Sequence, residues 1–161
     1  MSTASETAAA VWSLDREIVL VRVIDAPPAA VYAAWVEVGS FCEWFGPEGF
    51  TCKVHEMDVG PGGRARFDMV SSDGTTYTNR FDYLEVAPDS RLVMDHGVDI
   101  DDDPARFRVT VTFDQQDDGK TVLTLRQLHP SPEQRNAGIA FGAVELGLQT
   151  MRKLEHHLGV G

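Results

Sequence analysis

The sequence has little cysteine and no long apolar run, and these two shortages set the first limits. Its two cysteines, Cys42 and Cys52, are typical of separate buried thiols and not of a disulfide framework. No stretch approaches the roughly 20 apolar residues of a membrane span, and residues 1–15 lack the basic start and apolar centre of a secretory signal. We therefore expect a soluble, cytoplasmic protein.

Basic residues are also scarce. The chain carries 14 Lys and Arg against 25 Asp and Glu, a formal net charge of −11, and the basic residues are scattered along it. Phosphate backbones and anionic lipids are therefore poor partners, and we expect no nucleic-acid binding. The length of 161 residues without an internal repeat predicts one domain over 16–161, preceded by a flexible Ser-, Ala- and Thr-rich segment over 1–15.

Motifs for catalysis and metal binding are missing as well. There is no Gly-x-Ser-x-Gly elbow, and the glycine-rich run 60–63 lacks the lysine of a phosphate loop. The five histidines include no spaced pair beside a cysteine, as a zinc site would need. The acidic run 99–104 has Pro104 where a calcium loop needs glycine, and Thr110 where it needs glutamate. We expect a solvated acidic turn there, with no metal and no cofactor.

The first part of the chain predicts one strand and two short helices. Residues 17–24 are rich in Val and Ile and too short for a typical helix, so we expect a strand. A short helix follows, because Pro28 suits the first helical position and apolar residues recur at helical spacing up to Trp35. A second brief helix is expected to open at Ser40, which has the capping-box spacing with Glu43.

From residue 50 the apolar period becomes alternating and turn signals recur, which predicts an antiparallel meander. The alternation is clearest in 106–113, where Phe107, Val109, Val111 and Phe113 share one face and the polar residues between them take the other. One face of the sheet should therefore be dry and the other wet. The expected strands are 50–58, 64–71, 75–86, 91–97, 105–114 and 120–128.

The C-terminal part predicts a long helix that carries unexpected glycines. Ser131 and Pro132 form a strong helix start, and an apolar stripe then continues to residue 158. The helix should run about 25 residues, roughly 38 Å at 1.5 Å per residue, long enough to cross the sheet. Gly138, Gly142 and Gly147 each cost about 1 kcal/mol there relative to alanine. Gly142 and Gly147 either permit close contact with the sheet or withhold side chains that would fill a gap.

Several segments together resemble the START-like, or SRPBCC, superfamily. They are APPAAVYAAWVEVGSFCEWFGPEGF, VGPGGRARFDM, YLEVAPDSRLV and GLQTMRKLEHHL, and the likeness covers about 17–158. The nearest branch is named after the activator of the heat-shock-protein-ninety ATPase. The resemblance implies an α+β helix-grip fold, in which a seven-stranded antiparallel curved sheet and a long C-terminal helix enclose an apolar cavity. One departure is Gly147-Leu148, where many family members have Gly-Trp.

The apolar residues of this layout predict a pocket of roughly 300–1,000 Å³ that holds a small hydrophobic or amphipathic ligand. His96 or Tyr83 would orient the ligand. The candidate lining residues are Trp35, Trp44, Phe45, Phe67, Met69, Tyr83, Met94, His96, Phe107, Val109, Val144, Leu148 and Met151.

Two other functions stay open. The family branch implies a chaperone-partner module, which would use an exposed surface. A cyclase- or lyase-like enzyme could use the same cavity, with acid–base groups drawn from His96, Tyr77, Tyr83, Arg80 and Asp82. No catalytic motif singles out any of them, so ligand binding is the favoured interpretation.

Overall fold

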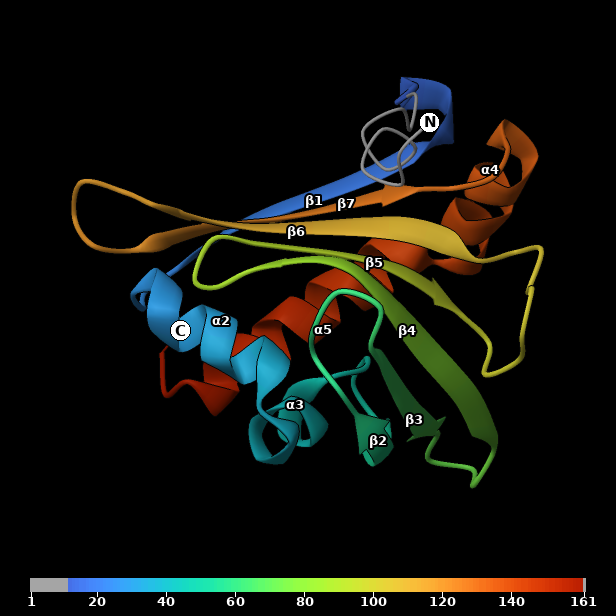
Figure 1. Cartoon of the computed structure of the whole chain (residues 1–161), viewed down its shortest axis with the longest axis horizontal. Coiled ribbons are helices and arrows are strands. Elements are labelled where there is room, and N and C mark those ends of the chain that lie inside the picture. Colours follow the sequence, from blue (N-terminus) through green and yellow to red (C-terminus); the bar gives the residue numbers. More distant parts are fainter. Residues whose placement is uncertain (1–11, 161) are drawn as a thin grey trace.

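The computed structural model describes residues 12–160 and has an α+β architecture (Figure 1). A seven-stranded antiparallel sheet has the order β1-β7-β6-β5-β4-β3-β2, so the first strand lies beside the last. The strands are β1 (Glu17–Ile24), β2 (Thr51–Met57), β3 (Arg64–Val70), β4 (Thr76–Ala87), β5 (Arg91–Gly97), β6 (Phe107–Gln115) and β7 (Thr121–Leu128). The helical elements are η1 (Leu14–Arg16), α2 (Pro28–Val36), α3 (Val38–Trp44), α4 (Pro132–Phe141) and α5 (Ala143–His157).

The strand limits lie within one or two residues of those expected from the sequence, because glycine, proline and aspartate mark nearly every turn. The sheet curves around α5, which runs from α4 across the sheet to the side occupied by α2 and α3 (Figure 1). The predicted helix-grip fold is therefore confirmed. None of the helices in the described part of the chain is both long and apolar enough to cross a membrane.

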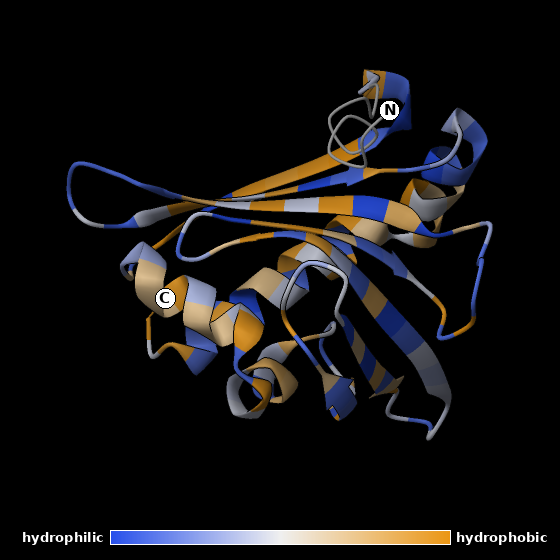
Figure 2. Ribbon diagram, viewed as in Figure 1, coloured by the Kyte–Doolittle hydropathy of each residue, from blue (hydrophilic) through white to orange (hydrophobic). Residues whose placement is uncertain are grey.

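Apolar and polar residues alternate along β4, as Figure 2 shows in the colours of that strand, whereas β1 also carries exposed valines, Val19, Val21 and Val23, on its outer face. In β6, Val109, Val111 and Phe113 are at most 4% exposed and face the helices. Thr110 on the other face is also buried, at 6% exposed, so that face is not uniformly wet. Its cross-strand partner Arg126 lies over the ring of Trp12, with 4.1 Å between the guanidinium carbon and the ring centroid.

The expected flexible segment 1–15 falls mostly outside the described residues. Trp12 to Arg16 are described, and they lie against the polar face near the start of β1 (Figure 1). Glu17, the first residue of β1, accepts a hydrogen bond of 2.6 Å from Arg126 of β7.

The single long C-terminal helix expected from the sequence is wrong. Gly142 has φ of 105°, ends α4 and precedes α5. A left-handed residue cannot continue a right-handed helix, and glycine adopts this conformation at least cost. Open space surrounds the position where a Cβ of Gly142 would lie, so this glycine serves the break and not a close packing contact.

The capping box expected at Ser40 is also absent. The second helix begins two residues earlier, at Val38, with Glu37 as its N-cap, and Ser40 lies inside its first turn. A seven-residue helix that packs Phe41 and Trp44 into the core takes its limits from that burial rather than from a local capping pattern.

An aromatic cluster forms the centre of the core where α3 meets the sheet. The rings of Phe41 and Phe45 stack with 4.5 Å between centroids, and Phe67 meets Phe81 edge-on at 4.9 Å. Trp35 and Trp44 pack at 5.0 Å beside them. This cluster fixes α2 and α3 on the sheet and leaves α5 to cover the remainder.

Helix α5 is attached to β1 and to the loop that follows α3. Arg22 of β1 forms an ion pair with Glu155 of α5. On the other side, Lys153 donates hydrogen bonds to the carbonyl oxygens of Pro47 and Phe50, at 3.2 and 3.3 Å. Helix α5 is therefore held on two sides, by β1 and by the loop after α3.

Candidate functional site

A cavity of about 110 Å³ lies between α5 and the sheet. It is smaller than the roughly 300 Å³ expected at the lower end of ligand pockets, and the buried Met151 and Leu154 of α5 are among the side chains that line it. Its lining comes from α2, α3 and the residue after it, β4 to β7 and α5: Trp35, Trp44, Phe45, Phe81, Met94, His96, Phe107, Val109, Leu123, Leu125, Gln127, Gly147, Thr150, Met151 and Leu154.

Most of the residues expected to line the pocket do meet at this cavity. They share an inward position on the sheet or on a helix that faces it. They are Trp35, Trp44, Phe45, Met94, His96, Phe107, Val109 and Met151.

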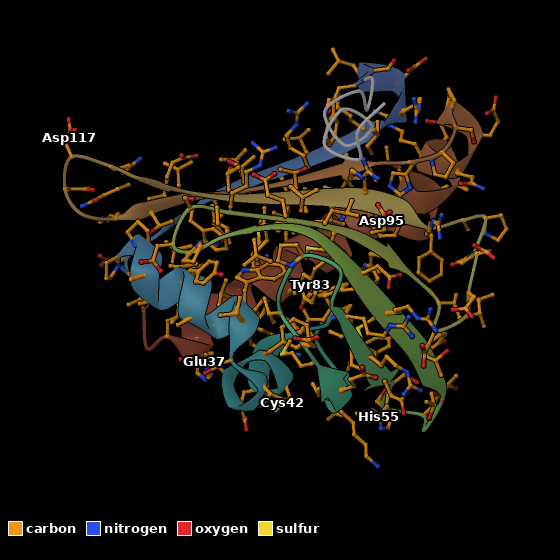
Figure 3. The ribbon with its side chains drawn as sticks, viewed as in Figure 1. Glu37, Cys42, His55, Tyr83, Asp95 and Asp117 are labelled. Carbon is orange, nitrogen blue, oxygen red and sulfur yellow. The ribbon has the colours of Figure 1, made fainter. Side chains whose placement is uncertain are left out.

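The other expected residues lie elsewhere. Phe67 and Tyr83 are 1% and 2% exposed and belong to the packed core, where Tyr83 occupies the middle of the molecule (Figure 3). Leu148 packs against the core without reaching the cavity, and Val144 is 38% exposed. Met69 lines a separate groove described below.

Sequence reasoning missed part of the lining. Leu123 and Leu125 alternate with polar residues along β7, and this period-two pattern could have placed them on the inner face, whereas the polar Gln127 carried no such signal. Phe81 lies two residues before Tyr83 on β4 and therefore shares its face. Thr150 had no such signal, since it is a polar residue within a helix.

Gly147 lets α5 approach the sheet beside the cavity. A Cβ at this position would lie closer than 3.0 Å to Cδ1 of Leu20 on β1, a separation that real Cβ atoms do not show. This close approach is the first of the two roles that the sequence suggested for Gly147. Because the helix touches β1 here, the free space remains farther along, over β5, β6 and β7.

His96 is the principal polar group of the cavity, and its hydrogen bond sets its tautomer. Asn79 donates through Nδ2 to the carbonyl oxygen of Tyr77 at 2.9 Å, which turns its Oδ1 towards His96. His96 Nε2 lies 2.9 Å from that oxygen. An amide oxygen accepts only, so Nε2 carries the hydrogen and Nδ1 keeps its lone pair.

The surroundings of His96 favour a neutral imidazole. The rings of Phe81 and Phe107 lie 4.9 and 5.0 Å from it. Burial lowers the pKa of His96 from 6.5 to about 4, and the negative charge of Asp103 opposes that effect only in part. At neutral pH the cavity therefore holds no formal charge on any of its lining residues.

A separate groove of about 510 Å³ lies beside the cavity, and the two spaces share no lining residue. They are lined by neighbouring residues on shared elements: Phe81 lines the cavity and Asn79 the groove, while Gly147 lines the cavity and Leu146 the groove. The Asn79–His96 hydrogen bond therefore joins a residue of the groove to a residue of the cavity. The groove is lined by Pro47, Phe50, Met69, Thr76, Tyr77, Thr78, Asn79, Val98, Phe141 and Leu146.

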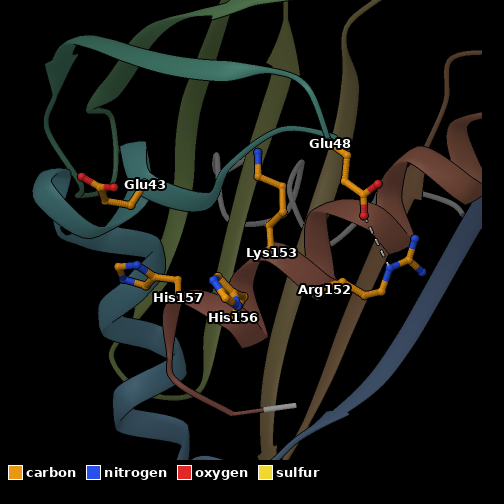
Figure 4. A pocket seen from close by; sticks show the side chains of 6 residues that line it. All are labelled: Glu43, Glu48, Arg152, Lys153, His156 and His157. Atoms are coloured by element: carbon orange, nitrogen blue, oxygen red, sulfur yellow. Dashed lines mark ion pairs between the residues drawn. The ribbon is translucent and has the colours of Figure 1, made fainter.

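A third hollow, of about 450 Å³, lies at the end of α5 beside α3 (Figure 4). Ionisable side chains line it, and Arg152 approaches Glu48 to 4.0 Å; the lining residues are Glu43, Glu48, Arg152, Lys153, His156 and His157. Lys153 is already bonded to two backbone carbonyls. This ionisable lining does not suit an apolar ligand.

The acid–base residues considered from the sequence are not brought together. Arg80 lies on the outer face, where it donates to Asp99 at 3.0 Å and to Asp101 at 2.7 Å. Asp82 is also outside, near Arg64. Tyr83 is buried, and that burial raises the pKa of its hydroxyl. The enzyme alternative therefore lacks a convergent set of such groups at the cavity.

The acidic run 99–104 is more ordered than the solvated turn expected. Asp99 accepts from Arg66 at 2.9 Å, and Asp103, which is 8% exposed, accepts from the backbone N–H groups of Val98 and Ala105. Within residues 12–160, no three His, Cys, Asp or Glu side chains are grouped as a metal site would require.

Comparisons with known proteins agree with this architecture. Residues 25–159 match the family described as Activator of Hsp90 ATPase homolog 1-like protein. A crystal structure from Chromobacterium violaceum is 26% identical, with 89% of this chain and 96% of that chain covered and a TM-score of 0.71. A solution structure from Arthrobacter aurescens is 20% identical, with 94% and 91% covered and a TM-score of 0.84, and this likeness concerns the fold alone. The curated proteins include no significant match.

Proposed function

The chain belongs to the Activator of Hsp90 ATPase homolog 1-like family, and we propose that it binds a small hydrophobic or amphipathic ligand between α5 and the sheet. Members of one fold family differ widely in function, so the proposal rests on the cavity and not on the family alone.

The observation that carries the proposal is an apolar cavity beneath α5 with an open, mainly apolar groove beside it. The cavity lining has no formally charged side chain, and Trp35, Trp44 and Met94 in it are at most 3% exposed. Apolar surface of a ligand would be removed from water here, at about 25 cal/mol per Å² before the entropic costs of binding. The indole N–H of Trp35 has no partner among the described residues and is a further polar group beside this space.

The two volumes suggest how a ligand would be accommodated. An engineered apolar cavity of roughly 150 Å³ binds benzene, so a space of about 110 Å³ limits the buried part of a ligand to at most one small ring or a short branched chain. The remainder of a larger ligand would lie in the groove of about 510 Å³, past the Asn79–His96 pair. This division favours a ligand with a compact head and an apolar body.

The test is binding of the uncharged fluorescent probe N-phenyl-1-naphthylamine. We expect saturable one-site enhancement of its fluorescence, and at least a tenfold higher Kd in Val109→Phe, whose added ring occupies the cavity. Val122→Phe makes the same substitution on the opposite face of the sheet and should leave Kd unchanged. Equal affinity in wild type and Val109→Phe would show that the probe binds elsewhere and would refute the proposal.

A second candidate function is association with a chaperone of the Hsp90 class, as the family description suggests. The structural support is an exposed apolar group at the α4–α5 junction, where Phe141 is 83% and Ile139 is 38% exposed. We expect the ATPase rate of a purified Hsp90-class chaperone to rise in the presence of the protein. Phe141→Ser should weaken this effect, whereas Val21→Ser on the outer face of β1 should not; an unchanged ATPase rate contradicts this candidate.

A further inference from the structure

We propose that the inner cavity recognises an uncharged hydroxyl group, carried on a small ring such as a phenol or a cyclic alcohol, which donates its hydrogen to Nδ1 of His96. This inference rests on the proposed function, since it specifies the head group of the ligand that the cavity binds. Neither the family match nor the solved structures bear on this point.

The hydrogen-bond chain from the sheet fixes which group His96 presents. The carbonyl oxygen of Tyr77 orients Asn79, and Asn79 Oδ1 in turn takes the hydrogen of His96 Nε2. Nδ1 makes no hydrogen bond to residues 12–160, and it is not among the side-chain atoms sealed away without a partner. An unprotonated imidazole nitrogen is an acceptor, so its complement on a ligand is a donor.

The charge of the lining excludes ionised head groups. No Asp, Glu, Lys or Arg lines the cavity. Asp103 is engaged by two backbone N–H groups, and Arg80 is engaged by carboxylates on the outer face of the sheet. A carboxylate or ammonium group on the ligand would be buried without a counter-ion, which costs far more than burying a neutral hydroxyl that finds a partner.

Two further polar side chains extend the site on the other side of the cavity. Gln127 lines it, and its side-chain amide makes no hydrogen bond to the described residues, so this amide can accept from or donate to a ligand. Thr150 Oγ1 donates to the carbonyl oxygen of Leu146 at 3.0 Å, which leaves the hydroxyl oxygen as an acceptor. These groups suit a polar neutral ring and supply no compensating charge.

The volume limits the size of the head group. The space of about 110 Å³ is smaller than the roughly 150 Å³ of a cavity that binds benzene, so one six-membered ring with one small substituent is the upper limit for the head group. Phenol, toluene and benzoate share that ring and differ in the substituent. At pH 7 the substituent is a hydrogen-bond donor in phenol, an apolar group in toluene and an anion in benzoate. They are therefore the probes of choice.

The experiment titrates phenol, toluene and benzoate into ¹⁵N-labelled full-length protein at pH 7, with binding followed by amide and imidazole ¹⁵N shifts. We expect His96→Phe, which keeps a ring of similar shape, to raise the Kd of phenol by about tenfold, because the buried hydroxyl of phenol would be left without a partner. The same variant should change the Kd of toluene by less than about threefold. His156→Phe removes an exposed histidine outside the cavity and serves as the matched control.

The wild-type protein supplies an independent measurement that does not depend on how a variant folds. Phenol should shift the His96 Nδ1 resonance, and toluene should shift only amides of the lining. Benzoate should bind at least tenfold more weakly than phenol.

The outcomes separate the two proposals. The hydroxyl assignment is overturned, and the ligand-binding function still stands, if toluene binds and the affinity for phenol is unchanged in His96→Phe. The same conclusion follows if benzoate binds with an affinity equal to that of phenol. Failure of phenol and toluene alike to perturb the cavity residues overturns both.

Discussion

Replacing Gly147 with alanine sets two opposing effects against each other. Alanine is favoured over glycine within a helix by about 1 kcal/mol. The new Cβ would, however, lie closer than 3.0 Å to Cδ1 of Leu20, which is only 6% exposed and held within the core. Overpacking of this kind costs about 1–3 kcal/mol. We therefore expect Gly147→Ala to destabilise the protein by about 1 kcal/mol.

The neighbouring Gly138 and Gly142 give two controls, for which the expected changes in the free energy of unfolding are opposite to each other in sign. At Gly138 the nearest atoms would lie 3.9 Å from an added Cβ, so Gly138→Ala should stabilise by about 1 kcal/mol. Gly142 has open space but a φ of 105°, so Gly142→Ala should destabilise by about 1–2 kcal/mol through the backbone alone.

The assay is urea unfolding of the three variants, with thermal unfolding as a second measure. For a chain of this size 1 kcal/mol corresponds to about 2–4 °C in Tm. The Leu20→Ala background removes the clash, so Gly147→Ala should become stabilising there. If Gly147→Ala stabilises the wild-type protein as much as Gly138→Ala does, the close approach of α5 to β1 is refuted.

Further predictions concern pH and the core. The pKa of His96 is lowered to about 4, so on acidification the unfolded chain binds a proton at this imidazole at a higher pH than the folded protein does. The contribution of His96 to the free energy of unfolding is therefore fully present above pH 6.5 and is lost as the pH drops towards 4, by up to about 3 kcal/mol. Urea midpoints should show a smaller loss in His96→Phe, although His129, whose pKa burial also lowers, retains its own share. Hydrogen bonding to Arg66 lowers the pKa of Asp99, so its stabilising effect is lost as the pH falls below about 3.8; Asp99→Asn should be less stable at pH 7 and show a shallower acid response. Phe67→Ala should cost about 3–5 kcal/mol because its ring is fully buried, whereas Phe141→Ser should change the free energy of unfolding by less than about 0.5 kcal/mol. Calorimetric Tm values that rank these two phenylalanines equally would contradict the burial on which both predictions depend.

The sequence predicted the strands well because their limits are local. Turn residues such as Gly74 and Gly119, both with positive φ, can be recognised without knowing what packs on the strand. The break at Gly142 was missed for the opposite reason: glycine is compatible with both a continuous helix and a left-handed cap, and the choice depends on where α4 and α5 each meet the sheet. Gly147 was ambiguous until its distance to Leu20 was known.

The cavity was predicted in kind but not in size or polarity. Apolar periodicity identifies inward-facing residues such as Trp35 and Met94, but it does not tell how completely neighbouring side chains fill the space between them. Asn79 and Gln127 were overlooked because polar residues on a strand are normally assigned to the wet face. Their inward positions follow from strand register, which is set by pairing with distant segments.

The pairing of β1 with β7 has a consequence for the order of folding on the ribosome. Glu17 pairs with Leu128, so the first strand to be synthesised has no partner until more than a hundred residues have followed. Strands β2 to β6 can pair as they emerge, but the surface that α5 covers stays open to water until Ala143 and the residues after it have left the exit tunnel. A nascent chain stalled before that point would leave the apolar face of the sheet uncovered, where it can aggregate or be bound by molecular chaperones.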